Sequence, residues 1–166
     1  MGGVRVETET WILKDFFVQF GRTPKDEFME KFDGGFLLVR FRESPPLVVS
    51  LLRDPKFKLI IGGDEDCDLD FIGDPTLDPE HCRLVYHEGF KGWTVEDLDT
   101  SFGTHLDGDR LSASRPTLLR NRSVFKPGGG LTELQFYDAE SLQARIAKSG
   151  VTRSLRRQEA PKNEEG

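Results

Sequence analysis

The spacing of hydrophobic residues changes along the chain and separates a helical beginning from a long series of short strands. Residues 11–20 (WILKDFFVQF) place apolar side chains at helical spacing, although alternation just before them leaves a strand as the alternative. Residues 24–33 favour a helix, because Thr23 suits an N-cap and Pro24 suits the first helical position. Residues 36–41 (FLLVRF) then predict a strand.

From residue 47 onward, short apolar segments alternate with turn residues, which is typical of antiparallel sheets. Between residues 66 and 71, Cys, Leu and Phe alternate with Asp, so we expect a half-buried strand. Asp107-Gly108 is a strong two-residue hairpin signal. The other predicted strands are LVVSLL, FKLII, CRLVY, WTVEDL, PTLL, SVF and LTELQFY. About ten short strands at this spacing predict an all-β sandwich.

One further helix is predicted after the strands, capped by Asp138 and ending at Ala147. The residues from Ser149 onward are charged and lack aromatic side chains, so we expect disorder there. The predicted fold is mainly β and has four parts: an N-terminal α/β appendage packed on the core (1–45), a β-sandwich (46–137), a short C-terminal helix (138–148) and a disordered tail (149–166).

Composition fits a globular protein and argues against several classes of partner. The 166 residues are 36% hydrophobic and 31% charged, and the net charge of −6 argues against nucleic-acid binding. No apolar run approaches the ~20 residues of a membrane helix, and the N-terminus lacks the layout of a signal peptide, so we expect no membrane insertion. Cys67 and Cys82 lie in apolar segments, which favours free thiols in a reducing, cytoplasmic compartment.

No spacing of ligands or nucleophiles indicates catalysis, a metal or a cofactor, so we expect a protein that is not an enzyme. The cysteines and histidines form no zinc-binding pair, and Leu69 and Pro75 stand where a calcium loop needs Gly and Glu. From Asp64 to Glu80 there are eight acidic residues and no basic one. This stretch is either a solvated loop face or a docking surface for a basic partner.

Three motifs occur in an order that resembles the forkhead-associated (FHA) domain family. They are IIGG at 60–63, HCRL at 81–84 and WTVEDLDTSFGT at 93–104, and LDGDRL follows them. The resemblance spans residues 46–137. It implies an FHA-like antiparallel β-sandwich whose loops at one end bind a phosphothreonine peptide and perform no chemistry.

The structural positions of the family pattern are retained in this sequence. They are Gly62, His81, Asp97, Gly103 and Thr104. The resemblance implies that Gly62 ends a strand and that His81 braces the loops.

The ligand-binding positions of the pattern differ. The family's phosphate-binding Arg is Gly63, its Ser before the His is Asp78, and its peptide-binding Asn is Phe102. Only Ser101 retains a hydroxyl. At ~4 Å and an effective dielectric near 20, one charge pair is worth about 4 kcal/mol. The lost attraction to the Arg and the added repulsion from the Asp therefore cost together about as much as the whole binding free energy of a micromolar complex, about 8 kcal/mol.

Two functions follow from this pattern. The first is a non-catalytic interaction module that binds a protein or peptide independently of phosphothreonine, and this partner is basic if the 64–80 stretch is a docking surface. The second is a phosphothreonine-peptide-binding module that uses the displaced cations Arg83, Arg110 or Arg120. Thr8 and Thr10 in VETET resemble the switch segments of small bacterial FHA regulators, with a simple alternating strand as the other interpretation.

Overall fold

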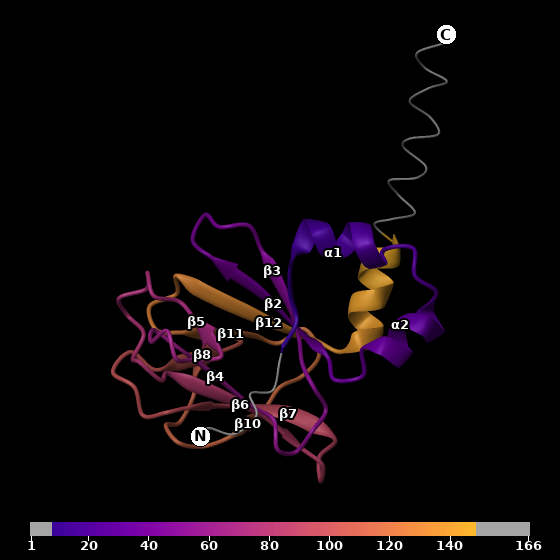
Figure 1. Cartoon of the computed structure of the whole chain (residues 1–166). Helices are drawn as coiled ribbons and strands as arrows, with labels where there is room; N and C mark the ends of the chain where they lie inside the picture. The colour runs from indigo at the N-terminus through magenta and orange to yellow at the C-terminus, as the bar shows by residue number, and fades with distance from the viewer. Residues whose placement is uncertain (1–7, 149–166) are drawn as a thin grey trace.

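Within residues 8–148, which the computed structural model describes, twelve short strands and three helices build the protein (Figure 1). The strands are β1 (Thr10–Ile12), β2 (Phe36–Phe41), β3 (Leu47–Ser50), β4 (Lys58–Gly62), β5 (Leu69–Asp70), β6 (Cys82–His87), β7 (Gly92–Asp97), β8 (Thr104–Leu106), β9 (Asp109–Arg110), β10 (Thr117–Leu118), β11 (Val124–Pro127) and β12 (Thr132–Tyr137). The helices are α1 (Leu13–Phe20), α2 (Lys25–Lys31) and a terminal helix at 139–148.

The strands form two sheets that pack face to face. One sheet has seven strands in the order β1-β3-β2-β12-β11-β8-β9, and the other has five in the order β10-β7-β6-β4-β5. Neighbouring strands are antiparallel except β4 and β5, which are parallel. The hairpin predicted at Asp107-Gly108 joins β8 to β9. The mainly β sandwich with an N-terminal α/β part and a C-terminal helix confirms the predicted fold class.

The strand predicted before Phe71 is mostly wrong, because only Leu69–Asp70 pairs with β4. Before it the chain turns at Asp64, whose Oδ1 accepts a hydrogen bond from the Asp66 N–H at 2.9 Å. Cys67 and Phe71 are buried nevertheless. The alternating pattern therefore predicted burial correctly, while an Asp-stabilised turn replaced most of the strand.

Two helix starts were predicted from capping residues, and they turn out differently. The α2 helix begins at Lys25, with Pro24 in the N-cap position and no side-chain cap, so the cap predicted at Thr23 is wrong. The cap predicted at Asp138 is confirmed, since its Oδ1 accepts a hydrogen bond from the Ser141 N–H at 2.7 Å.

The β2 strand is apolar on both faces because it separates two hydrophobic cores. Leu37 and Val39 face the core between the two sheets. Phe36 and Leu38 face a second, Phe-rich core under the helices. Figure 1 shows α1, α2 and the terminal helix together on that side of the seven-stranded sheet.

The seven-stranded sheet crosses the boundary predicted at residue 45. The β2 strand pairs with β12 on one side and with β3 on the other, so it is an inner strand of the sandwich. The predicted domain boundary at residue 45 therefore stays a prediction. The predicted disorder of residues 149–166 also stays a prediction, because these residues lie outside the described part of the chain. No described helix is long and apolar enough to cross a membrane.

Candidate partner-binding loops

Three loops meet at one end of the sandwich, which we call the loop end. These loops are residues 63–81, which contain the two-residue strand β5, and residues 98–103 and 128–131. Backbone hydrogen bonds join them, from Gly63 N to Asp78 O at 2.9 Å and from Gly128 N to Gly103 O at 2.9 Å. The loop end thus has a fixed backbone on which side chains for recognition can be displayed.

His81 is fully buried where these loops meet. Its Nδ1 accepts a hydrogen bond from the Asp78 N–H at 3.1 Å. Its Nε2 lies 2.8 Å from the Gly103 carbonyl oxygen and 3.2 Å from the Thr100 Oγ1. One imidazole ring therefore contacts the loop before β6 and the loop after β7 at the same time.

The hydrogen bond at Nδ1 decides the tautomer of His81. Because Nδ1 accepts, the proton is on Nε2, which donates to the Gly103 carbonyl oxygen. The Gly128 N–H lies 3.2 Å from Nε2 but 2.9 Å from the Gly103 carbonyl oxygen, so we assign its hydrogen bond to the carbonyl. The 3.7 Å approach of Asp97 Oδ1 to Nε2 then joins a neutral ring and a carboxylate and is not an ion pair.

Asp97 is buried next to His81 and ties the start of the loop to its end. Its Oδ1 accepts hydrogen bonds from the hydroxyls of Thr100 and Thr104, both at 2.7 Å. Its Oδ2 accepts one from the Thr100 N–H at 3.1 Å. Burial alone would raise the pKa of Asp97, but these hydrogen bonds outweigh it and hold the pKa below its ordinary value.

Gly62 and Gly63 differ in how much space surrounds them. A Cβ on Gly62 would lie 2.1 Å from the Pro79 carbonyl oxygen, so this position requires glycine. A Cβ on Gly63 would lie 3.3 Å from the Leu77 carbonyl oxygen, which a shift of a few tenths of an ångström relieves. Steric demand thus explains the glycine at the first position, whereas the second position leaves room for a side chain.

Ser101 and Phe102 form the tip of the loop after β7 and are both exposed, Phe102 with 52% of its surface accessible. Gly103 follows with φ +76°, a left-handed conformation that favours glycine. A Cβ on Gly103 would lie 2.6 Å from the Nε of Arg110, so the Arg110 guanidinium lies directly against this loop.

The structure separates the three displaced arginines predicted from the sequence. Arg83 forms an ion pair with Glu96 at 2.9 Å. Arg120 follows Leu119, which is bonded to Trp93 O at the opposite end of β7 from the loop end. Arg110 alone of the three lies against Gly103, and within residues 8–148 its side chain has no ion pair or hydrogen bond.

A buried carboxylate that sequence reasoning missed also positions the loop end. Asp74 accepts hydrogen bonds from the Thr76 N–H at 3.0 Å, the Thr76 hydroxyl at 2.6 Å and the Thr132 hydroxyl at 3.0 Å. Thr76 Oγ1 in turn accepts one from the Gly129 N–H at 2.8 Å. The signal available was Asp-Pro-Thr, a local Asp turn, but its long-range partner Thr132 could not be identified from sequence spacing.

The remaining acidic residues of the 64–80 stretch form an exposed or half-exposed rim. Nothing in this rim resembles a metal site: across the described residues, no three His, Cys, Asp or Glu side chains are grouped so that they could hold a metal ion.

The sequence between β4 and β11 matches a known family. Residues 59–128 fit the family model described as the FHA domain. The chain contains an FHA domain. The match includes every candidate site residue from Gly62 to Arg110, and the comparison with curated proteins gives no match.

Solved FHA domains share this fold. The FHA domain of the CT664 protein from Chlamydia trachomatis is 19% identical, with 63% of this chain and 96% of that chain covered and a TM-score of 0.53. The N-terminal FHA domain of Rad53p from S. cerevisiae, determined with a phosphothreonine peptide, is 16% identical, with 67% and 98% covered and a TM-score of 0.56. At these identities the likeness shows the fold alone.

Proposed function

We propose that this FHA domain protein is a non-catalytic interaction module whose loop end binds a partner protein independently of phosphothreonine. The observation that carries the proposal is the adjacency of Gly63 and Asp78. The Gly63 N–H donates to the Asp78 carbonyl oxygen at 2.9 Å, so the missing guanidinium and the added carboxylate belong to neighbouring positions. A phosphate bound between these two positions would be repelled by the Asp78 carboxylate, and no arginine at position 63 would attract it.

The surface of the loop end supports a partner of different chemistry. Phe102 exposes 52% of its surface at a loop tip, where an aromatic side chain can anchor an interface. The residues from Asp64 to Glu80 provide seven exposed or half-exposed carboxylates, besides the buried Asp74, and no basic side chain. A basic protein or peptide with an apolar pocket for Phe102 fits both features, because the negative field increases its association rate.

The thiols support a binding role rather than nucleophilic catalysis. Burial raises the pKa of the Cys82 thiol, and burial is also the main reason that the pKa of the Cys67 thiol is raised. The Cys67 thiol donates to the Pro79 carbonyl oxygen at 2.9 Å. Both therefore stay protonated at neutral pH, when only a thiolate is a good nucleophile. Two free, buried cysteines also fit our proposal of a cytoplasmic protein.

Calorimetric titration with phosphothreonine peptides and their unphosphorylated counterparts tests this proposal. We expect no phosphate-dependent binding to the full chain. The triple variant Gly63→Arg, Asp78→Ser and Phe102→Asn restores the family's ligand residues and should gain such binding. If the parent already binds phosphothreonine peptides as tightly as the triple variant, the proposal is wrong.

A second candidate is favoured by the position of Arg110. Its guanidinium lies against Gly103 without an ion pair and could contact a phosphate from the β9 side of the loop end. In that case Arg110→Gln abolishes phosphothreonine binding by the parent chain. Arg120→Gln, at the other end of the sandwich, is the matched control and should have no effect. The same titration therefore separates the two candidates.

A further inference from the structure

The carboxylate of Asp78 is unpaired, although its backbone is held on both sides. The Asp78 N–H donates to His81 Nδ1 at 3.1 Å, and its carbonyl oxygen accepts a hydrogen bond from the Gly63 N–H at 2.9 Å. Asp78 is half-exposed, and within residues 8–148 its carboxylate forms no hydrogen bond or ion pair. A fixed backbone therefore presents a free negative charge at the loop end.

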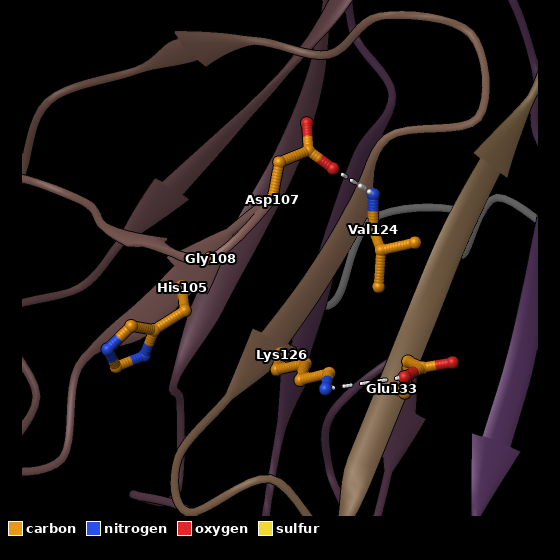
Figure 2. Close-up of a pocket in the computed structure, with 6 residues that line it drawn as sticks. All are labelled: His105, Asp107, Gly108, Val124, Lys126 and Glu133. Carbon is orange, nitrogen blue, oxygen red and sulfur yellow. Dashed lines mark hydrogen bonds and ion pairs between the residues drawn. The ribbon is translucent and has the colours of Figure 1, made fainter.

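Two carboxylates on the outer faces of the sheets are paired instead. Figure 2 shows Glu133 of β12 beside Lys126 of β11, and these two groups form an ion pair at 3.6 Å. Glu96 on the five-stranded sheet pairs with Arg83 at 2.9 Å. By contrast, no acidic side chain of residues 64–80 forms an ion pair within the described part of the chain. The charges of the loop end are thus available to a partner.

Phe102 lies close to the free carboxylate. The Gly103 carbonyl oxygen accepts a hydrogen bond from Nε2 of the same His81 ring, at 2.8 Å. Only the width of one imidazole therefore separates the backbones of Asp78 and Gly103. Phe102 precedes Gly103 and is 52% exposed. A single side chain of a partner can consequently contact both the Asp78 carboxylate and the Phe102 ring.

Gly63 leaves space beside this carboxylate. Its N–H bonds to the Asp78 carbonyl oxygen, and it adds no side chain of its own. The three atoms nearest to a Cβ built on Gly63 belong to Leu77 and Asp78, at 3.3 to 3.6 Å. A side chain from a partner can therefore approach Asp78 on this side.

Arg110 does not neutralise Asp78. Its guanidinium lies against Gly103, with Nε 2.6 Å from a Cβ built on that residue. Among residues 8–148, no ion pair joins Arg110 to Asp78 or to another carboxylate. The charge of Asp78 is left for a group from outside the protein, even with a cation in the same group of loops.

An arginine side chain fits these features. Its guanidinium can bond a carboxylate through two parallel N–H groups, and it stacks on aromatic faces. Its aliphatic stem covers apolar surface while the charged end stays hydrated. A lysine carries the same charge, but its ammonium is a point charge without the planar fork.

We infer that the loop end binds an arginine side chain of the partner, with its guanidinium on the Asp78 carboxylate and its stem against Phe102. This inference rests on the proposed function and adds which side chain the partner presents. The stem forms one wall of the apolar pocket that covers Phe102. The other carboxylates of residues 64–80 attract the basic segment that carries this arginine.

Three acetylated peptide amides test this inference by NMR titration of the full chain. They are Ala-Leu-Arg-Leu-Ala, its citrulline counterpart, which has the same shape without the charge, and its Glu counterpart. The Arg peptide should shift the Asp78 and Gly103 amides saturably and bind about fivefold more tightly than the citrulline peptide, and the Glu peptide should not bind. Equal binding of the Arg and citrulline peptides, or no saturable shift with the Arg peptide, would overturn the inference.

Substitutions at the loop end locate the site. Asp78→Asn removes only the free carboxylate, so it should weaken binding of the Arg peptide about fivefold and leave Tm unchanged. Glu80→Gln removes an exposed carboxylate of the same loop and is the matched control, with a smaller expected effect. Phe102→Leu removes the aromatic face and should weaken binding as well. Equal losses in Asp78→Asn and Glu80→Gln, or a large loss of Tm in Asp78→Asn, would contradict the assignment to Asp78.

An arginine built into the chain should compete with the peptide. Gly63→Arg places a guanidinium next to Asp78 and should abolish binding of the Arg peptide. Gly63→Gln, which adds a neutral polar side chain at the same position, is the control and should retain binding. If both variants bind the Arg peptide equally, Asp78 is not its site.

The phosphothreonine titration of the proposed function separates this inference from the function on which it rests. If the parent chain binds neither phosphothreonine peptides nor the Arg peptide, this inference alone is wrong. If it binds phosphothreonine peptides and not the Arg peptide, both are wrong. Binding of the Arg peptide without phosphate-dependent binding supports both.

Discussion

His81 and Phe102 lie in the same group of loops, yet their surroundings are opposite. His81 is fully buried and its two ring nitrogens bond two different loops. Phe102 exposes 52% of its surface at the tip of one of these loops. The same contrast separates Asp97, with three hydrogen bonds, from Ser101, which is exposed.

This contrast gives a physical reason why residues of the loop end should differ in how freely they can be substituted. Residues that bond other loops are constrained by folding, because their loss leaves buried polar groups without partners. Exposed residues at loop tips are constrained only by the partner that they contact. If our proposal is correct, changing the side chain of Phe102 or Asp78 alters partner recognition without disturbing the loops. Four substitutions test this separation.

The largest effect is expected for His81→Ala. It removes a fully buried ring, leaves the Asp78 N–H without its partner, and removes one of the two hydrogen bonds that the Gly103 carbonyl accepts. We expect a loss of about 3 kcal/mol in the free energy of unfolding, measured by urea denaturation. His105→Ala, at a half-exposed histidine of β8, is the matched control and should cost much less. Equal losses would contradict the bracing role proposed for His81.

The next largest loss, about 2 kcal/mol in the free energy of unfolding, is expected for Asp97→Asn. Both carboxylate oxygens of Asp97 accept hydrogen bonds, and asparagine replaces one of them with an amide nitrogen that cannot accept. The folded pKa of Asp97 lies below its ordinary value. Its ionisation therefore stabilises the fold fully above the unfolded pKa, about 3.9, and this contribution is lost as pH falls through the folded pKa. Asp97→Asn should flatten this part of the acid unfolding curve.

Glu140 provides the control for this pH dependence. Its hydrogen bond and ion pair with Lys25 lower its pKa as well, but this pair is exposed. Salt screens exposed pairs and affects buried hydrogen bonds far less. In 1 M salt we expect the acid dependence due to Asp97 to remain and that due to Glu140 to vanish. An acid curve of Asp97→Asn identical to that of the parent would refute the assignment.

Local patterns in the sequence predicted most of the sandwich, because strands and hairpins leave local signals. The Asp107-Gly108 turn and the two-sided apolar strand FLLVRF are examples. The strand expected before Phe71 failed because Asp64 forms a turn, and turn and strand compete for the same alternating residues. Contacts between residues far apart in sequence, such as the hydrogen bond from the Thr132 hydroxyl to Asp74, depend on packing between loops.

A smaller effect is expected for Gly103→Ala, about 1 kcal/mol, because alanine is strained at φ +76°. Gly108→Ala is the matched control, at φ +92° with no atom within 4 Å of the added Cβ. Both variants carry backbone strain, but only Gly103→Ala also displaces the Arg110 guanidinium. Thermal unfolding should show a slightly larger loss for Gly103→Ala. Equal losses would indicate that Arg110 moves freely and is not held against the loop.

The smallest effect on stability is expected for Phe102→Ala, because a half-exposed side chain at a loop tip contributes less than about 0.5 kcal/mol to folding. Its effect on partner binding should be large by contrast, since an aromatic anchor contributes about 2 kcal/mol or more to an interface. Urea denaturation measures the first quantity, and capture of partners from a lysate with the parent and variant chains, each with and without phosphatase treatment, measures the second. Phe90→Ala, at the other end of the sandwich, controls for loss of any exposed aromatic ring. If Phe102→Ala destabilises the fold as much as His81→Ala and leaves capture unchanged, Phe102 belongs with the buried residues of the scaffold, and the contrast between the two groups disappears.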